Sequence, residues 1–459
     1  MTQTLPVTNE NSVTNRMAQY ALSAAWHELP VEVQHESVRA WLNWVACAVG
    51  ASSTKAMDCA VRGIVSMEPN GTVPVPGRSE RVSLPDAALL GCVSSTAQTY
   101  DDTHFTTTTH PTGPVASALL SVAHVMAIAG KPVSGTEVLA ALVVGMELEC
   151  RTSCALTLNG VHPGWFMTGL SGAIGAAAAV GRLLKLTHQQ MVFAIGHAAT
   201  QAGGFRATHG SMGMTYIPGL AARNGVVAAY MAAADFTCGA IAIDGRNGLL
   251  QVLTLAADTS ALVDGLGTRY EFLGNVYKPF PCGFVIHAAL DACMHVVREN
   301  DIQHRDIERI DLKVAPKTLA LCWRKLPTNV FEAQVSLFHW VAAAFVRRAA
   351  GVRQGELDCV LDPDVRALQE RSDAEGDPLL ADNQARVTVR LRDGRILEHF
   401  TANCIGSMTH PMSDEQLADK FRELVRPILG EARMSALLAK CLELPSAVDA
   451  ATVLQMSVA

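Results

Sequence analysis

The segment from Ser171 to Leu186 constrains the fold of this chain more than any other stretch. Its sequence, SGAIGAAAAVGRLLKL, has helical spacing but consists largely of glycine and alanine. Helices in proteins are stabilised mainly by packing, and small residues let neighbouring backbones approach closely. No G-x-G-x-x-G sequence follows a strand here, so a nucleotide-binding loop is not indicated. We therefore expect this helix to lie inside a dense all-α core.

Apolar residues recur at helical spacing through most of residues 13–260, which predicts one helix after another. The clearest segments are Asn15–Trp26, Val31–Val49, Leu84–Ser95, Ala116–Ala129 and Gly135–Cys150. After about residue 268 the pattern changes, because Ile307–Val314 and Ala385–Leu391 alternate as half-buried strands do. Asp393–Gly394 then predicts a hairpin into Ile396–Phe400, and a helix is expected at Gln334–Arg348.

The last part of the chain returns to helical spacing, at Ser413–Leu429 and Ala432–Leu444. Because this tail resumes the pattern of the first part, the smaller α+β segment is expected to be an insertion. The predicted fold class is mainly α. We expect a large all-helical domain of residues 1–268 and 403–459, and an inserted smaller α+β domain of residues 269–402.

Composition excludes several classes of protein. Of the 459 residues, 49% are apolar and only 17% are charged, which is the opposite of a disordered chain. The net charge is 36 − 43 = −7 and no basic run occurs, so a nucleic-acid partner is not expected. No apolar run reaches the roughly 18 residues of a membrane span. So few charges instead predict a buried subunit interface, most simply that of a homodimer.

The amino terminus and the cysteines indicate a cytoplasmic protein. The first sixteen residues, MTQTLPVTNENSVTNR, are polar and lack the charged-then-apolar order of a signal peptide. Twelve cysteines are scattered from Cys47 to Cys441 without a C-x-x-C pair, as expected for reduced, buried thiols. Neither a disulfide framework nor a metal site is predicted.

The densest polar cluster is Tyr100–Pro114, YDDTHFTTTTHPTGP, which lies between two apolar helices. Threonine repeats and proline make a helix improbable, so a loop is expected, and loops often carry functional groups. The alternative is a turn in which an aspartate caps a helix and the histidines are solvated. Metal binding by His104 and His110 is weakly indicated, because their spacing matches no helical ligand pair.

Three further breaks in the helical pattern carry polar residues. They are Asn159–Gly164 with His162, Gly203–Gly219 with Arg206, His209 and Tyr216, and Tyr277–Gly283 with Lys278. Each has an ordinary alternative as a turn, a surface loop or an exposed lysine. Because such breaks line clefts, we expect six residues to converge at the junction of the two domains. These are Asp102, His104, His110, His162, Tyr216 and Lys278.

Together these segments resemble the MmgE/PrpD family, which includes 2-methylcitrate dehydratase, cis-aconitate decarboxylase and iminodisuccinate epimerase. The resemblance rests on DDTHFTTTTHPTGPVASALLSVAH, on GVHPG ahead of GAIGAAAAVGRLLKL, and on PGLAARNGVVAAYMAAADFT, YKPFPCGFVIHAALDA and EAQVSLFHWVAAAF. It covers about residues 15–440. It implies an all-α domain built from both ends of the chain, an α+β lid, a homodimer, and chemistry without a metal or cofactor.

Within the resemblance, Asp102, Thr103 and His110 match the family's D-D-T…H-P loop. His162 matches the H-P ahead of the small-residue helix, and Lys278 matches the lysine of K-x-[FY]-P at the domain junction. Two departures stand out. A lysine that many members carry falls near Met214 and is lost, and the histidine of the decarboxylases is replaced by Gly283.

The resemblance implies that a proton moves at a carbon next to a carboxylate of a small di- or tricarboxylate. This chemistry needs a positioned base, and groups that stabilise the developing enolate-like charge. The candidate catalytic residues are Asp102, His104, His110, His162 and Tyr216. The candidate substrate-binding residues are Thr103, Arg206, His209 and Lys278.

Loss of the family lysine removes a cation and favours a substrate with fewer carboxylates, and Tyr216 offers a second acid on the opposite face. Our first hypothesis is therefore a cofactor-independent epimerase of a small amino-dicarboxylate such as iminodisuccinate. The alternative is a lyase that resembles 2-methylcitrate dehydratase or cis-aconitate decarboxylase. A third hypothesis is a non-catalytic helical binding protein, because fold alone does not guarantee activity.

Overall fold

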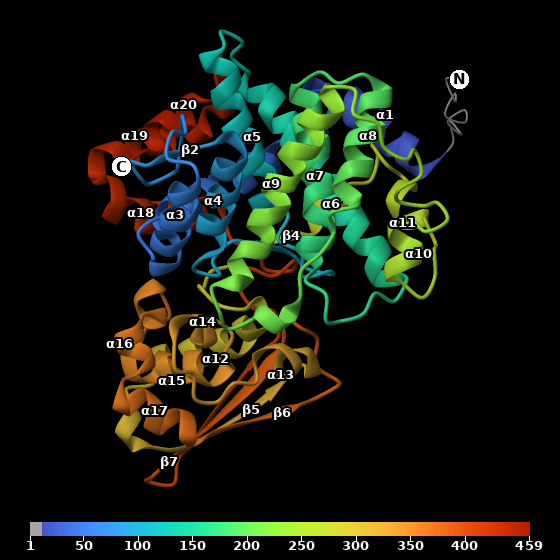
Figure 1. Ribbon diagram of the computed structural model, residues 1–459. Helices are drawn as coiled ribbons and strands as arrows, with labels where there is room; N and C mark the ends of the chain where they lie inside the picture. Colours follow the sequence, from blue (N-terminus) through green and yellow to red (C-terminus); the bar gives the residue numbers. More distant parts are fainter. Residues whose placement is uncertain (1–11) are drawn as a thin grey trace.

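The computed structural model describes residues 12–459. The first eleven residues, part of the segment in which no signal peptide is expected, lie outside the described residues. The chain is mostly helical, with a smaller unit that contains a sheet (Figure 1). No helix among the described residues is both long and apolar enough to cross a membrane. The prediction of a mainly α fold is confirmed.

The helical body is built by the first half of the chain and by its carboxy-terminal end. Its helices are α1 (Val13–Ser23), α2 (Val31–Gly50), α3 (Lys55–Met67), α4 (Leu84–Thr96), α5 (Thr112–Ile128), α6 (Gly135–Leu158), α7 (Met167–Leu183), α8 (His188–Ala199), α9 (Gly213–Ala233), α10 (Leu249–Leu253), α11 (Ser260–Val263), α18 (Asp414–Leu429), α19 (Glu431–Leu442) and α20 (Thr452–Ser457). Two short ribbons accompany them: β1 (Val73–Pro74) with β2 (Arg81–Val82), and β3 (Asp102–His104) with β4 (Asn275–Tyr277).

Helix α7 carries the glycine- and alanine-rich segment and lies buried between α6 and α9. The packing requires glycine, because a Cβ atom on Gly145 would lie 2.8 Å from the backbone oxygen of Gly175. On the other side, a Cβ atom on Gly225 would lie 2.4 Å from the Cβ atom of Ala176. Such distances are shorter than two heavy atoms tolerate. The small residues therefore set how closely these helices approach, as the sequence predicted.

Glu149 is a buried carboxyl group in this core. It lies on α6, is fully buried, and neither carboxyl oxygen has a hydrogen-bond partner among the described residues. Burial raises the pKa of Glu149 well above its ordinary value, and the charge of nearby Asp102 raises it further. The folded protein therefore keeps a proton on Glu149 at pH values where the unfolded chain has lost it.

Replacing Glu149 with glutamine is expected to remove one source of pH-dependent stability. Above the ordinary carboxyl pKa of about 4.3, folding of the wild type must bind a proton, so its stability falls as pH rises toward the raised pKa. The free energy of unfolding of Glu149→Gln relative to wild type should therefore increase between about pH 5 and about pH 8 in urea denaturation. Glu308→Gln, at an exposed glutamate, is the control. A difference that does not change with pH would contradict the prediction.

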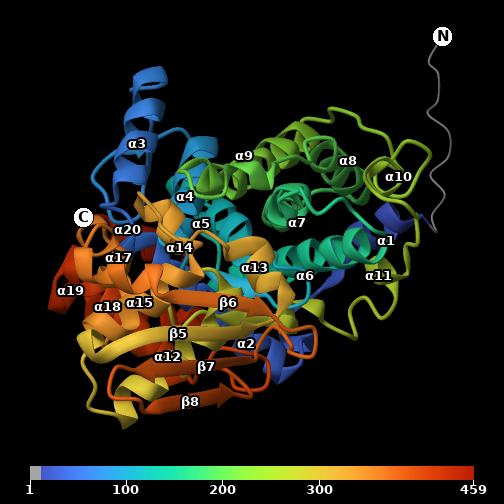
Figure 2. The ribbon, with the colours of Figure 1, turned by 90° about the horizontal axis from the view of Figure 1, so that it is seen from below.

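The smaller unit contains a four-stranded sheet with the order β6-β5-β7-β8 (Figure 2). Strand β5 pairs with β6 in parallel and with β7 antiparallel, and β7 pairs antiparallel with β8. Its strands are β5 (Ile307–Val314), β6 (Ser372–Gly376), β7 (Ala385–Leu391) and β8 (Ile396–Thr401). Its helices are α12 (His287–Glu299), α13 (Pro316–Cys322), α14 (Val330–Gln334), α15 (Leu337–Arg347), α16 (Leu357–Val360) and α17 (Pro363–Glu370).

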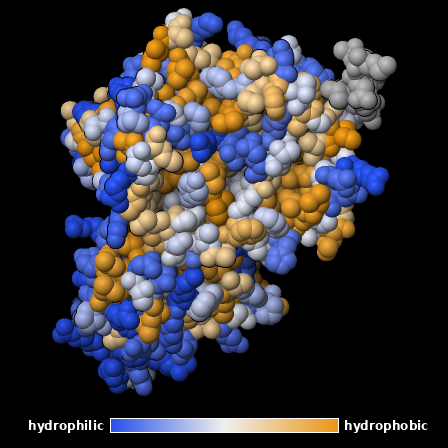
Figure 3. All heavy atoms as spheres, viewed as in Figure 1, coloured by the Kyte–Doolittle hydropathy of each residue, from blue (hydrophilic) through white to orange (hydrophobic). Residues whose placement is uncertain are grey.

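A second apolar core fills this unit and is built almost entirely from residues 282–404. Helices α12 and α15 cover the sheet, with Val296, Trp340 and Leu312 among the fully or nearly fully buried residues. On the face shown in Figure 3, hydrophilic side chains cover the outer end of the unit. The boundaries 269–402 and the role of a lid remain predictions. The homodimer also remains a prediction, for which exposed apolar residues of α9 offer a face, among them Val227, Tyr230 and Met231.

Two segments differ from the sequence prediction. Tyr100–Pro114 is not a loop throughout, because Asp102–His104 forms β3 and the next helix begins at Thr112. The expected loop Gly203–Gly219 ends early, since α9 begins at Gly213 and includes Pro218. All twelve cysteines are unpaired and ten of them are buried.

Candidate active site

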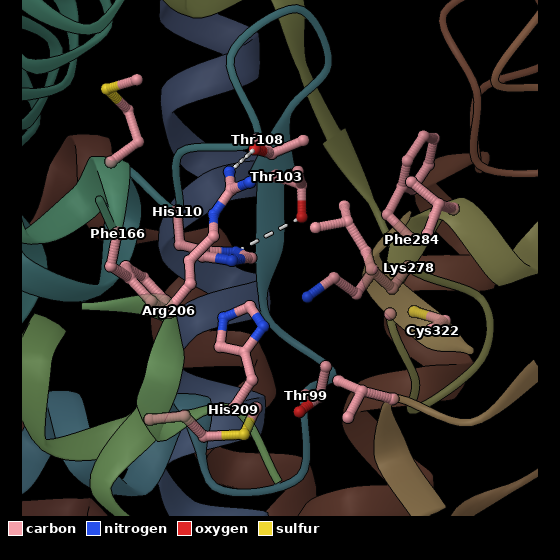
Figure 4. A pocket seen from close by; sticks show the side chains of 16 residues that line it. Thr99, Thr103, Thr108, His110, Phe166, Arg206, His209, Lys278, Phe284 and Cys322 are labelled. Carbon is pink, nitrogen blue, oxygen red and sulfur yellow. Dashed lines mark hydrogen bonds between the residues drawn. The ribbon is translucent and has the colours of Figure 1, made fainter. Parts of the chain in front are cut away.

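A cavity lies where the helical body meets the smaller unit (Figure 4). The polar residues that line it are Thr99, Thr103, Thr108, His110, Arg206, His209 and Lys278. The apolar residues that line it are Phe166, Met167, Met214, Gly283, Phe284, Val285, Leu321, Cys322 and Val335. The cavity therefore collects groups from segments far apart in the sequence.

The β3–β4 ribbon places the first charged pair of the site. Asp102 pairs with Tyr277 across the ribbon, which brings the neighbouring residues Asp101 and Lys278 together. The Lys278 ammonium donates to Asp101 Oδ1 at 2.6 Å, and both side chains are buried. Burial alone would raise the pKa of Asp101, but the nearby His110 and Lys278 outweigh it and lower this pKa. Asp101 is therefore a carboxylate that balances the charge of Lys278.

Lys420 holds this ribbon from α18, at the other end of the chain. Its buried ammonium donates to Asn43 Oδ1 at 2.8 Å, to the Tyr100 carbonyl oxygen at 2.7 Å and to the Lys278 carbonyl oxygen at 3.0 Å. Burial lowers the pKa of Lys420 to about 8. The sequence analysis did not single out this lysine. The signal that could have found it is a cation on the apolar face of a helix, between Leu417 and Leu424.

His110 presents a ring nitrogen that can exchange a proton. Its Nδ1 lies 2.7 Å from the Asp102 carbonyl oxygen, which can only accept, so Nδ1 carries a hydrogen and donates. Asp101 Oδ2 lies 3.4 Å from the same nitrogen and stabilises positive charge on the ring. The backbone N–H of His110 donates to Thr168 Oγ1 at 2.9 Å, which fixes the residue in place. The other nitrogen, Nε2, has no hydrogen-bond partner within residues 12–459.

Arg206 and His209 stand near His110 in the same cavity (Figure 4). The Arg206 guanidinium donates to Thr108 Oγ1 at 3.3 Å and makes no ion pair with a carboxylate in the described part of the chain. Burial and the charge of Arg206 lower the pKa of His209 to about 4. His209 is therefore a neutral imidazole at pH 7. Arg206 offers a cation to a bound carboxylate, and His209 offers a neutral hydrogen-bonding group.

Four residues that were expected in the cavity lie outside it. Asp102 points beneath the ribbon, where its Oδ2 accepts from Asn275 Nδ2 at 2.6 Å. The ring of His104 is engaged on both sides: Nδ1 with Thr107 Oγ1 at 2.8 Å and Nε2 with the Glu271 carbonyl oxygen at 3.1 Å. Burial lowers the pKa of His104 to about 4, which leaves the ring neutral. The side chains of Asp102 and His104 therefore hold the Tyr100–Pro114 segment in place through contacts outside the cavity.

The other two residues are on the surface. His162 is exposed, and its Nδ1 accepts the backbone N–H of Gly164 at 3.0 Å, as in an ordinary turn. Tyr216 is 48% exposed on α9 and does not line the cavity. Of the six residues expected to converge, only His110 and Lys278 line the cavity, and Thr103, Arg206 and His209 join them there.

One group of three potential metal ligands occurs among residues 12–459. Ligand atoms of His104, Cys154 and Glu271 lie within 4.8 Å of one another, outside the cavity. The Nε2 of His104 already contacts the Glu271 carbonyl oxygen, and the Glu271 carboxylate pairs with Arg269. These contacts are those of a packed polar cluster. Chemistry without a metal or cofactor stays our prediction.

Family comparisons cover most of the chain. The family model of the MmgE/PrpD N-terminal domain matches residues 15–261, and that of the MmgE/PrpD C-terminal domain matches residues 280–444. The chain belongs to the MmgE/PrpD family. The MmgE/PrpD cavity draws on both matched segments, with His110 and Arg206 from the first and Cys322 from the second. Lys278 lies between the two segments.

Proteins similar to this chain include cis-aconitate decarboxylases. Cis-aconitate decarboxylase of Aspergillus terreus is 25% identical over 474 residues, which cover 97% of this chain and 96% of that protein. The cis-aconitate decarboxylase-like protein oryM of Aspergillus oryzae is 25% identical over 473 residues, covering 98% of each chain. Human cis-aconitate decarboxylase is 27% identical over 361 residues, covering 73% of this chain and 71% of that protein.

The two positions at which the sequence departs from the MmgE/PrpD pattern both line the cavity. Met214 stands near the expected lysine, and Gly283 replaces the expected histidine. Position 283 is closely packed, since a Cβ atom there would lie 3.1 Å from Cys322 Sγ. The cavity of this chain is therefore less cationic and more apolar than the resemblance alone implies.

Proposed function

We propose that this MmgE/PrpD protein is a cofactor-independent lyase that releases CO2 from a small carboxylic acid and protonates the carbon left behind. The observation that carries the proposal is His110, whose Nδ1 is fixed by the Asp102 carbonyl oxygen while Nε2 stays without a partner in the described structure. Arg206 and Lys278 line the same cavity. The named activity of the similar proteins, decarboxylation of a small acid, supports the proposal.

Arg206, His110, His209 and Lys278 each have a separate role in the proposed reaction. Arg206 holds a substrate carboxylate, for which its guanidinium is suited because it can donate two parallel hydrogen bonds. The bond to the leaving carboxylate then breaks, its electron pair stays on the carbon chain, and CO2 departs. His110, protonated on both nitrogens, delivers the Nε2 proton to that carbon. The neutral ring of His209 and the Lys278 ammonium stabilise the negative charge that develops before the proton arrives.

The epimerase hypothesis has less support than this lyase. An epimerase needs acid–base groups on opposite faces of one carbon, and Tyr216 was expected to supply the second face. Tyr216 lies on the surface of α9, outside the cavity. His209 is held neutral by its low pKa of about 4 and is a weak base. We therefore prefer the lyase that was the alternative in the sequence analysis.

Incubation in deuterated water with small di- and tricarboxylates, including cis-aconitate, citrate and iminodisuccinate, tests the proposal. We expect CO2 to be released and deuterium to appear at one carbon of the product, both measured by nuclear magnetic resonance. The rate should be the same after treatment of the protein with a chelator. Exchange of hydrogen without loss of CO2 would overturn the proposal in favour of an epimerase. Loss of water would favour a dehydratase. No change with any acid would favour a non-catalytic binding protein.

A further inference from the structure

The two walls of the cavity differ in chemistry, which bears on the substrate of the proposed function. The helical body contributes the charged and hydrogen-bonding side chains of Thr103, His110, Arg206 and His209. Beyond Lys278, the smaller unit contributes Gly283, Phe284, Val285, Leu321, Cys322 and Val335. Figure 4 shows Phe284 and Cys322 on the side of the cavity opposite His110 and Arg206. Apart from Lys278, the groups that can balance substrate charge therefore come from the helical body.

Beyond Lys278, the side chains of the wall from the smaller unit carry no charge and no strong hydrogen-bond donor. Its one heteroatom on a side chain is the sulfur of Cys322, a fully buried thiol that stays neutral because burial raises its pKa to about 12. A carboxylate placed against these side chains would lose its hydration without gaining a charged side-chain partner, which is unfavourable. An alkyl group in the same place would be removed from water, which is favourable.

Met214 extends the apolar wall from the other side. Met214 lies in the first turn of α9, which belongs to the helical body. Its side chain is 8% exposed and packs in the apolar core of the smaller unit. Val285, Cys322 and Val335 are members of the same core. The apolar surface is therefore continuous across the junction of the two units.

We propose that the substrate is a dicarboxylate that carries an apolar substituent. Its carboxylates face Arg206 and Lys278, and its alkyl group lies against the wall formed by Met214, Phe284 and Val335. Arg206, Lys278 and the protonated His110 are offset by one carboxylate, that of Asp101, which contacts Lys278 and His110. The remaining positive charge suits two carboxylates rather than three. This inference rests on the proposed function, because it takes this cavity as the substrate site.

Binding of unreactive acids tests the inference without requiring turnover. Isothermal titration calorimetry would compare succinate, propylsuccinate and propane-1,2,3-tricarboxylate at one pH. Since each buried methylene contributes about fourfold in affinity, propylsuccinate is expected to bind at least about tenfold more tightly than succinate. The tricarboxylate is expected to bind no better than succinate. A tricarboxylate that binds as tightly as propylsuccinate would overturn the inference, because the apolar wall would then accept a carboxylate.

A charge placed in the wall provides the matched variant. Met214→Lys is expected to abolish most of the advantage of propylsuccinate and to improve binding of the tricarboxylate. Met67→Lys makes the same change at an exposed methionine of α3 and should leave all three affinities unchanged. Leu321→Asn, a neutral change of similar size, should also reduce the propyl advantage. Unchanged preferences in both wall variants would overturn the inference.

The outcomes separate this inference from the function on which it rests. If the acids bind and the protein releases CO2, but a propyl group gives no advantage, only the inference on the substituent fails. If none of the three acids binds, or if Arg206→Gln binds them as tightly as the wild type, the cavity is not a carboxylate site. Both the inference and the proposed function then fail.

Discussion

Replacement of His110 by asparagine is expected to lower kcat by about 10²–10⁴, the contribution of a positioned acid or base. Asparagine can keep the hydrogen bond to the Asp102 carbonyl oxygen but has no group at the place of Nε2 that exchanges a proton near pH 7. KM should change little, because Arg206 and Lys278 remain in the cavity. Steady-state kinetics of CO2 release would measure both constants.

A variant of His162 tests whether the loss of kcat is specific to His110. His162→Asn changes the same residue type in an exposed turn outside the cavity, and we expect kcat within about twofold of wild type, as for a surface substitution. His104→Asn should lower stability rather than kcat, since both ring nitrogens are engaged behind the site. Equal losses of kcat in the His110 and His162 variants would contradict the assignment.

Replacement of Lys278 by methionine is expected to destabilise the fold by about 3–5 kcal/mol, as when one partner of a buried ion pair is removed. The Asp101 carboxylate would stay buried without its ammonium partner at 2.6 Å. Without Lys278 the pKa of Asp101 should rise, so the loss of stability should be larger at pH 8 than at acidic pH. The free energy of unfolding from urea denaturation at the two pH values measures the effect.

The double variant Asp101→Asn, Lys278→Met separates stability from activity. Removing both charges leaves no unpaired ion, so the double variant is expected to recover most of the stability lost in Lys278→Met. It should not recover activity, because the substrate still lacks a cation. Lys313→Met, at an exposed lysine of β5, controls for the loss of a surface charge. A double variant less stable than Lys278→Met would show that the Asp101 carboxylate and the Lys278 ammonium do not neutralise each other in the folded protein.

Much of the fold could be predicted because its elements have strong local patterns. Ile307–Val314 and Ala385–Leu391 form strands with the predicted bounds, since polar and apolar residues alternate throughout the second and, apart from Glu308–Arg309, along the first. The short strand Ser372–Gly376 was missed because its sequence, SDAEG, has no apolar alternation. Its pairing with β5 is parallel and long-range, and no local pattern specifies it.

The site could be predicted only in part, for a related reason. The polar breaks in the helical pattern did locate the residues around His110, Arg206 and Lys278. The sequence could not tell which histidine of the cluster faces the cavity, because that depends on which ring nitrogens find partners. His104 and His110 are six residues apart, yet only the ring of His110 retains a nitrogen without one. Lys420 was missed because its partners lie as far as 377 residues away.

The contacts of Lys420 also affect when the protein becomes competent during its synthesis. The ribosome makes His110 and Arg206 early, but the ammonium that ties the Tyr100 and Lys278 carbonyl oxygens together belongs to Lys420, 320 residues after Tyr100 and 142 residues after Lys278. Contacts of such long sequence separation form late, because much of the chain must be ordered first. A nascent or truncated chain would therefore hold most of the chemical groups of the site without the geometry that makes them act together.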